Sequence, residues 1–171
     1  MKSTADSPRR VLVIVGLALA GLVALLHWYD TRRLNEQTIE LEEHVCASLN
    51  TQQTSESLER VASGYFPEDG PSSTPSVSVE PLRGILGSYR HPSWRLSGTA
   101  YFGRGGRWWL LRPWGEDTLS EINDAPDPIV NAPRSVCSVQ PGGNRNEVDV
   151  VMPFRFGKVE TAILVRAQRK H

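Results

Sequence analysis

The sequence contains few of the residues, and none of the short motifs, on which enzyme catalysis commonly depends. Its 171 residues include only two cysteines and four histidines. None of the histidines stands at a spacing typical of a metal site or a catalytic triad. No GxSxG, HExxH, GxGxxG or phosphate-loop pattern is present. We therefore expect a protein that is not an enzyme and that uses no metal or other cofactor.

The chain also lacks an excess of either charge. Nineteen basic side chains are balanced by nineteen acidic ones. Nucleic-acid-binding domains usually have a clear basic excess, so we expect no nucleic-acid partner. Lysine is scarce, and arginine supplies nearly all the positive charge. This usage suggests the codon bias of a GC-rich bacterial genome.

One stretch has no charge at all, namely Val11–Leu26 with the sequence VLVIVGLALAGLVALL. A bilayer core of about 30 Å is crossed by roughly 20 helical residues. Trp28 and Tyr29 extend the run and place aromatic rings where an interface is expected. We predict a transmembrane helix over residues 11–29. A cleaved signal peptide is the alternative, but its best cleavage site, Ala18-Leu19-Ala20, would leave an apolar mature end.

The basic residues that flank this stretch indicate its orientation. Lys2, Arg9 and Arg10 precede it, whereas Arg32 and Arg33 follow it. The positive-inside rule then predicts that residues 1–10 form a cytoplasmic tail and that the rest crosses the bacterial inner membrane to the periplasm. Small residues would let this signal-anchor helix pack closely on a partner helix. The helix-packing candidates are Gly16, Ala20 and Gly21.

Residues 30–64 are predicted to form a stalk helix or helices, because they contain no proline and a single glycine, Gly64. Leu34, Thr38, Leu41, Val45 and Ser48 recur at alternating spacings of four and three. The stripe would also suit a helix that packs on its own domain, and we leave both readings open. We expect a break within 50–57, with Thr54 or Ser55 capping a second helix that Gly64 ends. Residues 65–76 include PEDGPSSTPS and are predicted to be a flexible linker.

Residues 77–171 are predicted to form a small α+β head domain with a mostly antiparallel sheet. Glycines at 103–106 and at 157 mark two hairpin turns. Pro153 suggests an edge or a bulge. Thr118–Asn123 reads as a short helix, and the prolines after it predict loop. The expected strands are a short one around Val77 and Val79, then 94–102, 107–112, 134–140, 147–156 and 159–167.

Both cysteines, Cys46 and Cys137, lie on the same side of the predicted span. In an oxidising compartment a disulfide between them is the natural hypothesis, and closing so long a loop is worth about 4 kcal/mol in the chain-entropy model. Two unrelated buried thiols are an equally open alternative.

Residues 83–112 alternate arginines with aromatic residues and contain no acid. Such a surface could bind sugars, anionic lipid headgroups or a protein partner, although strand alternation alone would also place aromatics inside and arginines outside. Trp108 and Trp109 are adjacent, so one of them should lie off the core. The acidic stretch 116–127 is expected to neutralise nearby arginines. The partner-contact candidates are Arg104, Arg107, Trp108, Trp109, Arg112 and Trp114.

These observations predict a single-pass, non-catalytic accessory or scaffold subunit of a larger bacterial membrane complex. Pilus, secretion, respiratory and photosynthetic assemblies all suit it. Its partners would be the lipid bilayer and integral membrane subunits, with no small ligand expected. The alternative is a periplasmic sensor or small-ligand-binding ectodomain, which is weaker because residues 1–10 are too short to signal. The layout resembles that of a type IV pilin in outline, but Arg9-Arg10 stands where a prepilin has glycine, so no family is assigned.

Overall fold

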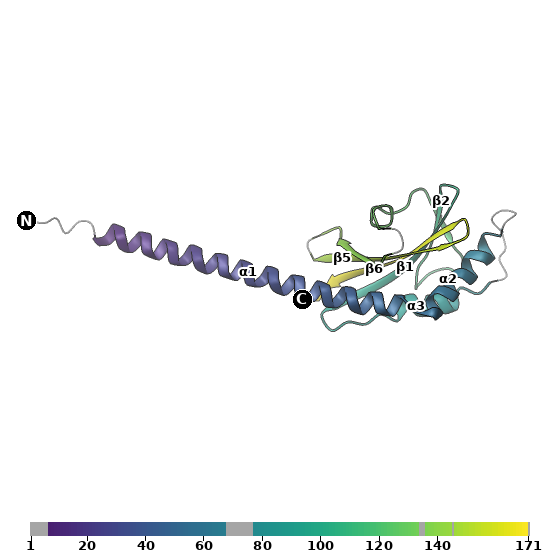
Figure 1. The fold of residues 1–171 in the computed structure, drawn as a ribbon, viewed down its shortest axis with the longest axis horizontal. Helices are drawn as coiled ribbons and strands as arrows, with labels where there is room; N and C mark the ends of the chain where they lie inside the picture. The colour runs from purple at the N-terminus through teal and green to yellow at the C-terminus, as the bar shows by residue number, and fades with distance from the viewer. Residues whose placement is uncertain (1–6, 68–76, 134–135, 145, 171) are drawn as a thin grey trace, which may run out of the picture. The chain divides into compact units, whose positions relative to one another are not determined.

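The computed structural model describes residues 7–67, 77–133, 136–144 and 146–170, and for 7–12 and 34 only the backbone is considered. The chain divides into two compact units, Met1–Glu40 and Leu41–His171. Figure 1 shows the ribbon of the chain. The second unit is called the head.

The first unit is dominated by helix α1, which spans Ser7–Leu49 and continues into the head. It is long and apolar enough to cross a membrane, and its apolar window is not buried inside the protein. Trp28 and Tyr29 are exposed, and the Arg32 guanidinium lies 5.5 Å from the centre of the Trp28 ring. The helix covers the predicted span 11–29. Of the predicted tail 1–10, Ser7–Arg10 is already helical, and residues 1–6 lie outside the described part.

The head begins at Leu41, before the predicted linker. Leu41, Val45 and Leu49 at the end of α1 are fully buried in the core. Helix α2, Gln52–Tyr65, buries Leu58 and Val61 in the same core. For Leu41 and Val45 the structure therefore supports the reading of a helix that packs on its own domain, whereas Ser48 of the same stripe is exposed and the side chain of Leu34 lies outside the described part. The linker 65–76 does not separate stalk from head, because Tyr65 and Phe66 are buried; residues 68–76 lie outside the described part.

The ends of α2 differ in detail from the prediction. The expected break is present, but the N-cap is Thr51, not Thr54 or Ser55, because the Thr51 hydroxyl accepts a hydrogen bond of 3.2 Å from the Thr54 amide. Gly64 lies inside the helix, which ends at Tyr65. A Cβ at Gly64 would lie 2.1 Å from the Cγ2 atom of Val77, so the glycine permits close packing of α2.

Helix α3, Glu80–Gly87, corrects the prediction of a strand around Val77 and Val79, which have no regular secondary structure. Pro81 is compatible with this helix because it stands in the first turn, where an amide has no helical partner. Leu82 and Leu86, one turn apart, are fully buried. The helix forms because these two residues gain burial against the core, which outweighs the poor helix propensity of its glycines.

The remainder of the head is built on a six-stranded sheet with the order β3-β2-β1-β6-β5-β4, in which all neighbouring strands are antiparallel. The head is thus α+β, as predicted, and α2 and α3 lie on one side of the sheet (Figure 1). Both predicted hairpins are present. The strands are β1 Trp94–Arg104, β2 Arg107–Leu111, β3 Ser120–Ile122, β4 Ser138–Pro141, β5 Glu147–Phe156 and β6 Val159–Arg169.

Local sequence explains the first hairpin turn and the position of Pro153. Gly105 and Gly106 both have positive φ, 61° and 81°, as a tight hairpin turn requires. Pro153 causes no bulge, because the pairing of β5 with β6 runs through it without interruption. Pro153 lies beyond the part of β5 that pairs with β4, so among the described residues this segment of β5 has a free edge. At such an edge no hydrogen bond is lost because proline lacks an amide hydrogen.

Two short elements correct the prediction for the region between the hairpins. The predicted helix Thr118–Asn123 is wrong, since Ser120–Ile122 forms strand β3 beside β2. The predicted loop after it contains the short helix α4, Asp127–Val130, with Pro128 in its first turn. Strand β4 begins at Ser138, one residue after Cys137, and residues 134–135 of the predicted strand lie outside the described part.

The sheet buries both of its faces, but unequally. The main core lies between one face and the three helices, and includes Phe102, Val150 and Ile163. On the other face a small cluster of Val151, Ala162 and Leu164 packs with Ile129 of α4. We call this second face the outer face.

A disulfide joins Cys46 of α1 to Cys137, with the two Cα atoms 5.9 Å apart and a sequence separation of 91. The disulfide hypothesis is therefore confirmed, and the alternative of two separate thiols is wrong. The bridge links the first and the last third of the chain, and it indicates a compartment that is not reducing.

Candidate functional site

The two adjacent tryptophans lie on opposite faces of β2, as strand alternation predicts. Trp109 packs against the main core, and its ring centre lies 4.7 Å from that of Phe66. Trp108 lies on the outer face across from Gly103, where an added Cβ would come within 2.8 Å of its ring. The ring of Trp108 therefore covers a position that only glycine leaves open. Both tryptophans are half-buried, so each has a packing role.

Two of the predicted contact arginines are engaged within the head. Arg104 donates hydrogen bonds of 2.8 and 2.6 Å to the carbonyl oxygens of Phe66 and Pro67. Arg107 donates one of 2.8 Å to a carboxylate oxygen of Glu121 and lies 5.5 Å from the centre of the Trp109 ring. Their charges are therefore used to hold the end of α2 and the edge strand β3.

Arg112 and Trp114 remain exposed, and they line a groove of about 430 Å³. Trp114 is the most exposed large apolar side chain of the described residues, at 83%. The groove runs over the β2 and β3 strands and is bounded by the loop between them. We call it the β3 groove; its lining includes Leu110, Arg112, Trp114, Glu116, Ser120 and Ile122.

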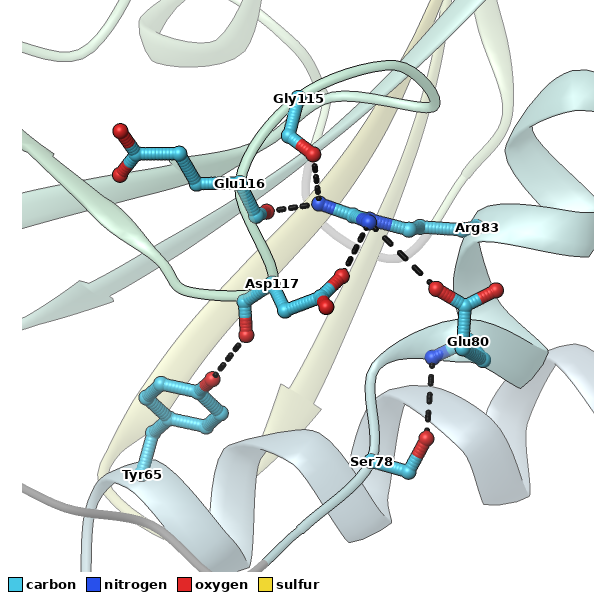
Figure 2. A network of polar contacts seen from close by, with 7 residues as sticks. All are labelled: Tyr65, Ser78, Glu80, Arg83, Gly115, Glu116 and Asp117. Carbon is cyan, nitrogen blue, oxygen red and sulfur yellow. Dashed lines mark hydrogen bonds and ion pairs between the residues drawn. The ribbon is translucent and has the colours of Figure 1, made fainter.

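A buried arginine holds the loop that displays Trp114. Arg83 of α3 has a side chain only 11% exposed. It donates a hydrogen bond of 2.8 Å to the carbonyl oxygen of Gly115, a second to that of Glu116, and a third to the Asp117 carboxylate (Figure 2). The Glu80 carboxylate approaches from the same helix at 3.4 Å.

Further contacts fix the two ends of this arrangement. Tyr65 of α2 donates a hydrogen bond of 3.2 Å from its hydroxyl to the carbonyl oxygen of Asp117 (Figure 2). Burial raises the pKa of Tyr65, against the opposing effect of Arg83, so the hydroxyl stays a donor at neutral pH. The Ser78 hydroxyl accepts a hydrogen bond of 3.3 Å from the Glu80 amide at the start of α3. Helices α2 and α3 and the loop at residues 115–117 are thus joined through Arg83 and its neighbours.

The predicted neutralisation of arginines is present for two acids of the stretch, both within the head. Asp117 pairs with Arg83, and Glu121 pairs with Arg107. From the sequence, Arg83 was expected to be one of the exposed arginines, because helix α3, in which its side chain becomes nearly buried, was not predicted. No signal in the local sequence distinguishes Arg83 from Arg90 or Arg95, so its role becomes visible only once α3 is placed beside the loop.

A second polar pair lies on the outer face, away from the β3 groove. Arg166 donates hydrogen bonds of 2.9 and 3.1 Å from two guanidinium nitrogens to the Asp149 carboxylate, whose side chain is 1% exposed. The hydrogen bond to Asp149 raises the pKa of Arg166. Nearby Tyr101 has a pKa raised by burial and opposed by Arg166 and Arg112. This pair satisfies a buried carboxylate and leaves no unpaired acid there.

The predicted helix-packing residues lie in the first unit. Gly16, Ala20 and Gly21 are exposed on α1, and an added Cβ at either glycine would contact nothing within 4 Å. Their role in packing against another helix stays a prediction.

Among the residues that the structure describes, no group of three or more His, Cys, Asp or Glu side chains is arranged to hold a metal ion. The groups that lie together therefore suit binding through shape, aromatic contact and charge. Comparisons with family models, with curated proteins and with solved structures find no match to this chain.

Proposed function

We propose that this protein is a non-catalytic accessory or scaffold subunit of a larger bacterial membrane complex. Helix α1 anchors it in the inner membrane with its N-terminus in the cytoplasm, and the head docks on a partner ectodomain in the periplasm. Trp114 and Arg112, at the β3 groove, are the contact residues within the head.

The observation that carries the proposal is that α1 contains both an exposed apolar run and the first residues of a disulfide-bonded core. Roughly 15 residues separate Leu26 from Leu41. Such a segment spans at most about 50 Å even when fully extended. The head is thus held close to a bilayer, where other membrane proteins are its nearest partners.

The surface of the head supports docking over small-ligand binding. Tryptophan is enriched among the residues that carry most of the binding energy near the centres of protein interfaces. The Arg83 contacts hold the loop that displays Trp114, so little additional ordering is needed when a partner binds. The β3 groove is partly open to solvent, whereas small-ligand pockets enclose most of their ligand.

The proposal is tested by solubilising membranes gently and purifying the tagged full-length chain. We expect a partner to copurify in a fixed ratio, and we expect Trp114→Ala to weaken its recovery by roughly tenfold, as loss of an interface tryptophan commonly does. Val130→Ala is the matched control, because Val130 is also an exposed apolar residue of the head but lies on α4. Recovery of the wild-type chain alone, as a monomer, would contradict the proposed function.

A further inference from the structure

We propose that the free edge of β3 accepts an extended segment of the partner as an additional strand. The segment has alternating aliphatic residues, a carboxylate that pairs with Arg112 and a basic side chain that pairs with Glu116. This inference rests on the proposed function, because it specifies how the head binds the ectodomain of its partner.

The first argument is the position of β3 at the end of the sheet. Its three residues pair with β2 on one side, through the register Trp108↔Ile122 and Leu110↔Ser120. Within the described part of the chain no strand pairs with its other edge. An edge strand leaves every second amide and carbonyl directed outward, which is the pattern that strand addition uses.

The opposite edge of the sheet is less suited to the same use. Strand β4, Ser138–Pro141, ends in a proline, which has no amide hydrogen to donate. Its Gln140 side chain is already engaged with the carbonyl oxygen of Pro128, at 3.0 Å. The β3 edge is short and has no proline, and it adjoins a groove.

The second argument is the shape of the surface beside this edge. Leu110 and Ile122 lie half-buried on the outer face and line the groove. Side chains on an added strand would alternate between this face and the opposite one, so every second residue could contact this apolar surface. An aliphatic residue at alternate positions is the chemistry that such a surface selects.

The third argument is charge. Arg112 and Glu116 both line the groove and are exposed. Neither side chain forms an ion pair with another described residue, whereas the neighbouring Glu121 is paired with Arg107. A segment that brings an acid to Arg112 and a base to Glu116 would complement both charges, which mainly sets register and specificity.

The fourth argument is the rigidity of the groove wall. Trp114 follows Arg112 closely in the loop that Arg83 holds, and an added Cβ at Gly87 of α3 would lie 4.0 Å from the Cζ2 atom of the Trp114 ring. The ring therefore lies near α3 while 83% of the residue is exposed. An exposed aromatic side chain beside an open edge can cover one side chain of an incoming strand.

The test uses the full-length chain in lipid nanodiscs as the target for a displayed library of random dodecapeptides. We expect the selected peptides to alternate aliphatic residues with charged ones and to include an acidic residue. Trp114→Ala and Ile122→Lys should each weaken their binding by roughly tenfold or more. Arg155→Glu is the matched control, since Arg155 is an exposed arginine on β5, and should leave binding unchanged.

Two further measurements separate this mode of binding from others. Selection against the Arg112→Glu variant should replace the acidic residue by a basic one. Amide hydrogen exchange of Ser120–Ile122 should slow when a selected peptide binds. Peptides of helical pattern, binding that Ile122→Lys does not change, self-association through β3, or unchanged exchange of the β3 amides would each overturn the inference.

These failures are distinguishable from failure of the proposed function. If a partner copurifies with the full-length chain and Ile122→Lys leaves its recovery unchanged, the subunit role stands and strand addition is wrong. If the full-length chain is always recovered alone, the proposed function itself is contradicted.

Discussion

Arg83 donates hydrogen bonds to the consecutive carbonyl oxygens of Gly115 and Glu116 and to the Asp117 carboxylate. A planar guanidinium can serve several acceptors at once, whereas a lysine ammonium on a flexible chain cannot reproduce this geometry. The side chain is nearly buried, so its loss would leave two carbonyl groups and a carboxylate without their partner. Arg83 therefore makes most of the side-chain hydrogen bonds that hold the loop bearing Trp114.

We expect Arg83→Ala to lower the free energy of unfolding by about 2–3 kcal/mol, since hydrogen bonds to charged groups are worth about that much. Amide hydrogen exchange of residues 113–119 should accelerate, while that of β1 and β6 should change only in proportion to global stability. Arg83→Lys should restore little of the protection. Arg90→Ala, at an exposed site just after α3, is the control; equal effects at positions 83 and 90 would contradict this role.

Tyr89 predicts how stability depends on alkaline pH. Its ring lies over Gly98 of β1, and its hydroxyl has no hydrogen-bond partner among the described residues. Burial raises the pKa of Tyr89 well above its usual value. Above about pH 10 the hydroxyl of Tyr89 therefore stays protonated in the folded state but loses its proton in the unfolded state. The contribution of Tyr89 to the free energy of unfolding is full below that pH and is lost as the pH rises further.

Urea unfolding between pH 8 and 11 tests this expectation. Above about pH 10 the contribution of Tyr89 should fall by about 1.4 kcal/mol per pH unit. Tyr89→Phe should remove that part of the decline and should cost little at pH 8, because no hydrogen bond is lost. Tyr101→Phe should change the slope less, since Arg166 and Arg112 oppose the effect of burial on its pKa. An unchanged slope in Tyr89→Phe would contradict the assignment.

At the scale of elements, the two hairpins were predictable from local sequence and the short elements were not. Alternating residues and glycine turns define β1, β2, β5 and β6 within a few residues, because turn geometry and strand period are local properties. Strand β3 forms in spite of a sequence that reads as helix. Its ladder with β2 and the Arg107–Glu121 pair are contacts with a distant part of the chain.

Helix α3 could not be predicted from its local sequence either, because here a helix forms where the sequence does not favour one. Its sequence, EPLRGILG, contains a proline and two glycines, and the preceding Val77 and Val79 alternate as a strand would. Only the burial of Leu82 and Leu86 under the sheet makes a helix favourable. Because α3 carries Arg83, which holds the loop next to Trp114, the candidate site could not be predicted as a whole, although Arg112 and Trp114 themselves were named from sequence.

The disulfide is the element-scale contact with the largest expected effect on stability. It joins α1 to the residue before β4 and closes a loop of 91 residues. The chain-entropy model assigns such a loop about 4–5 kcal/mol. We expect Cys46→Ser and Cys137→Ser each to lower the free energy of unfolding by about that amount, and the double variant to be no worse than either single one.

Thermal denaturation of the single and double variants, with nonreducing gels alongside, measures this directly. Reduction should change the mobility of the wild-type chain and of neither variant. Wild-type mobility that is the same before and after reduction, or variants as stable as the wild type, would contradict the bridge.

At the scale of the whole molecule, the head includes residues before the predicted linker as well as those after it. The composition of 65–76 placed the boundary at residue 77, but the core begins at Leu41 and the chain before the linker supplies two of its helices. The apolar run and the head core are therefore separated by a short polar segment of α1. The proposed function assigns anchoring to the first part of α1 and docking to the head.

The measurement that tests anchoring most directly is the intact mass of the protein recovered from separated membrane and soluble fractions. We expect it in the membrane fraction, with a mass that includes residues 11–26 and with Cys46 and Cys137 oxidised to a disulfide. A protein recovered from the soluble fraction and cleaved after the apolar run, or a membrane-bound chain with both thiols reduced, would contradict the account.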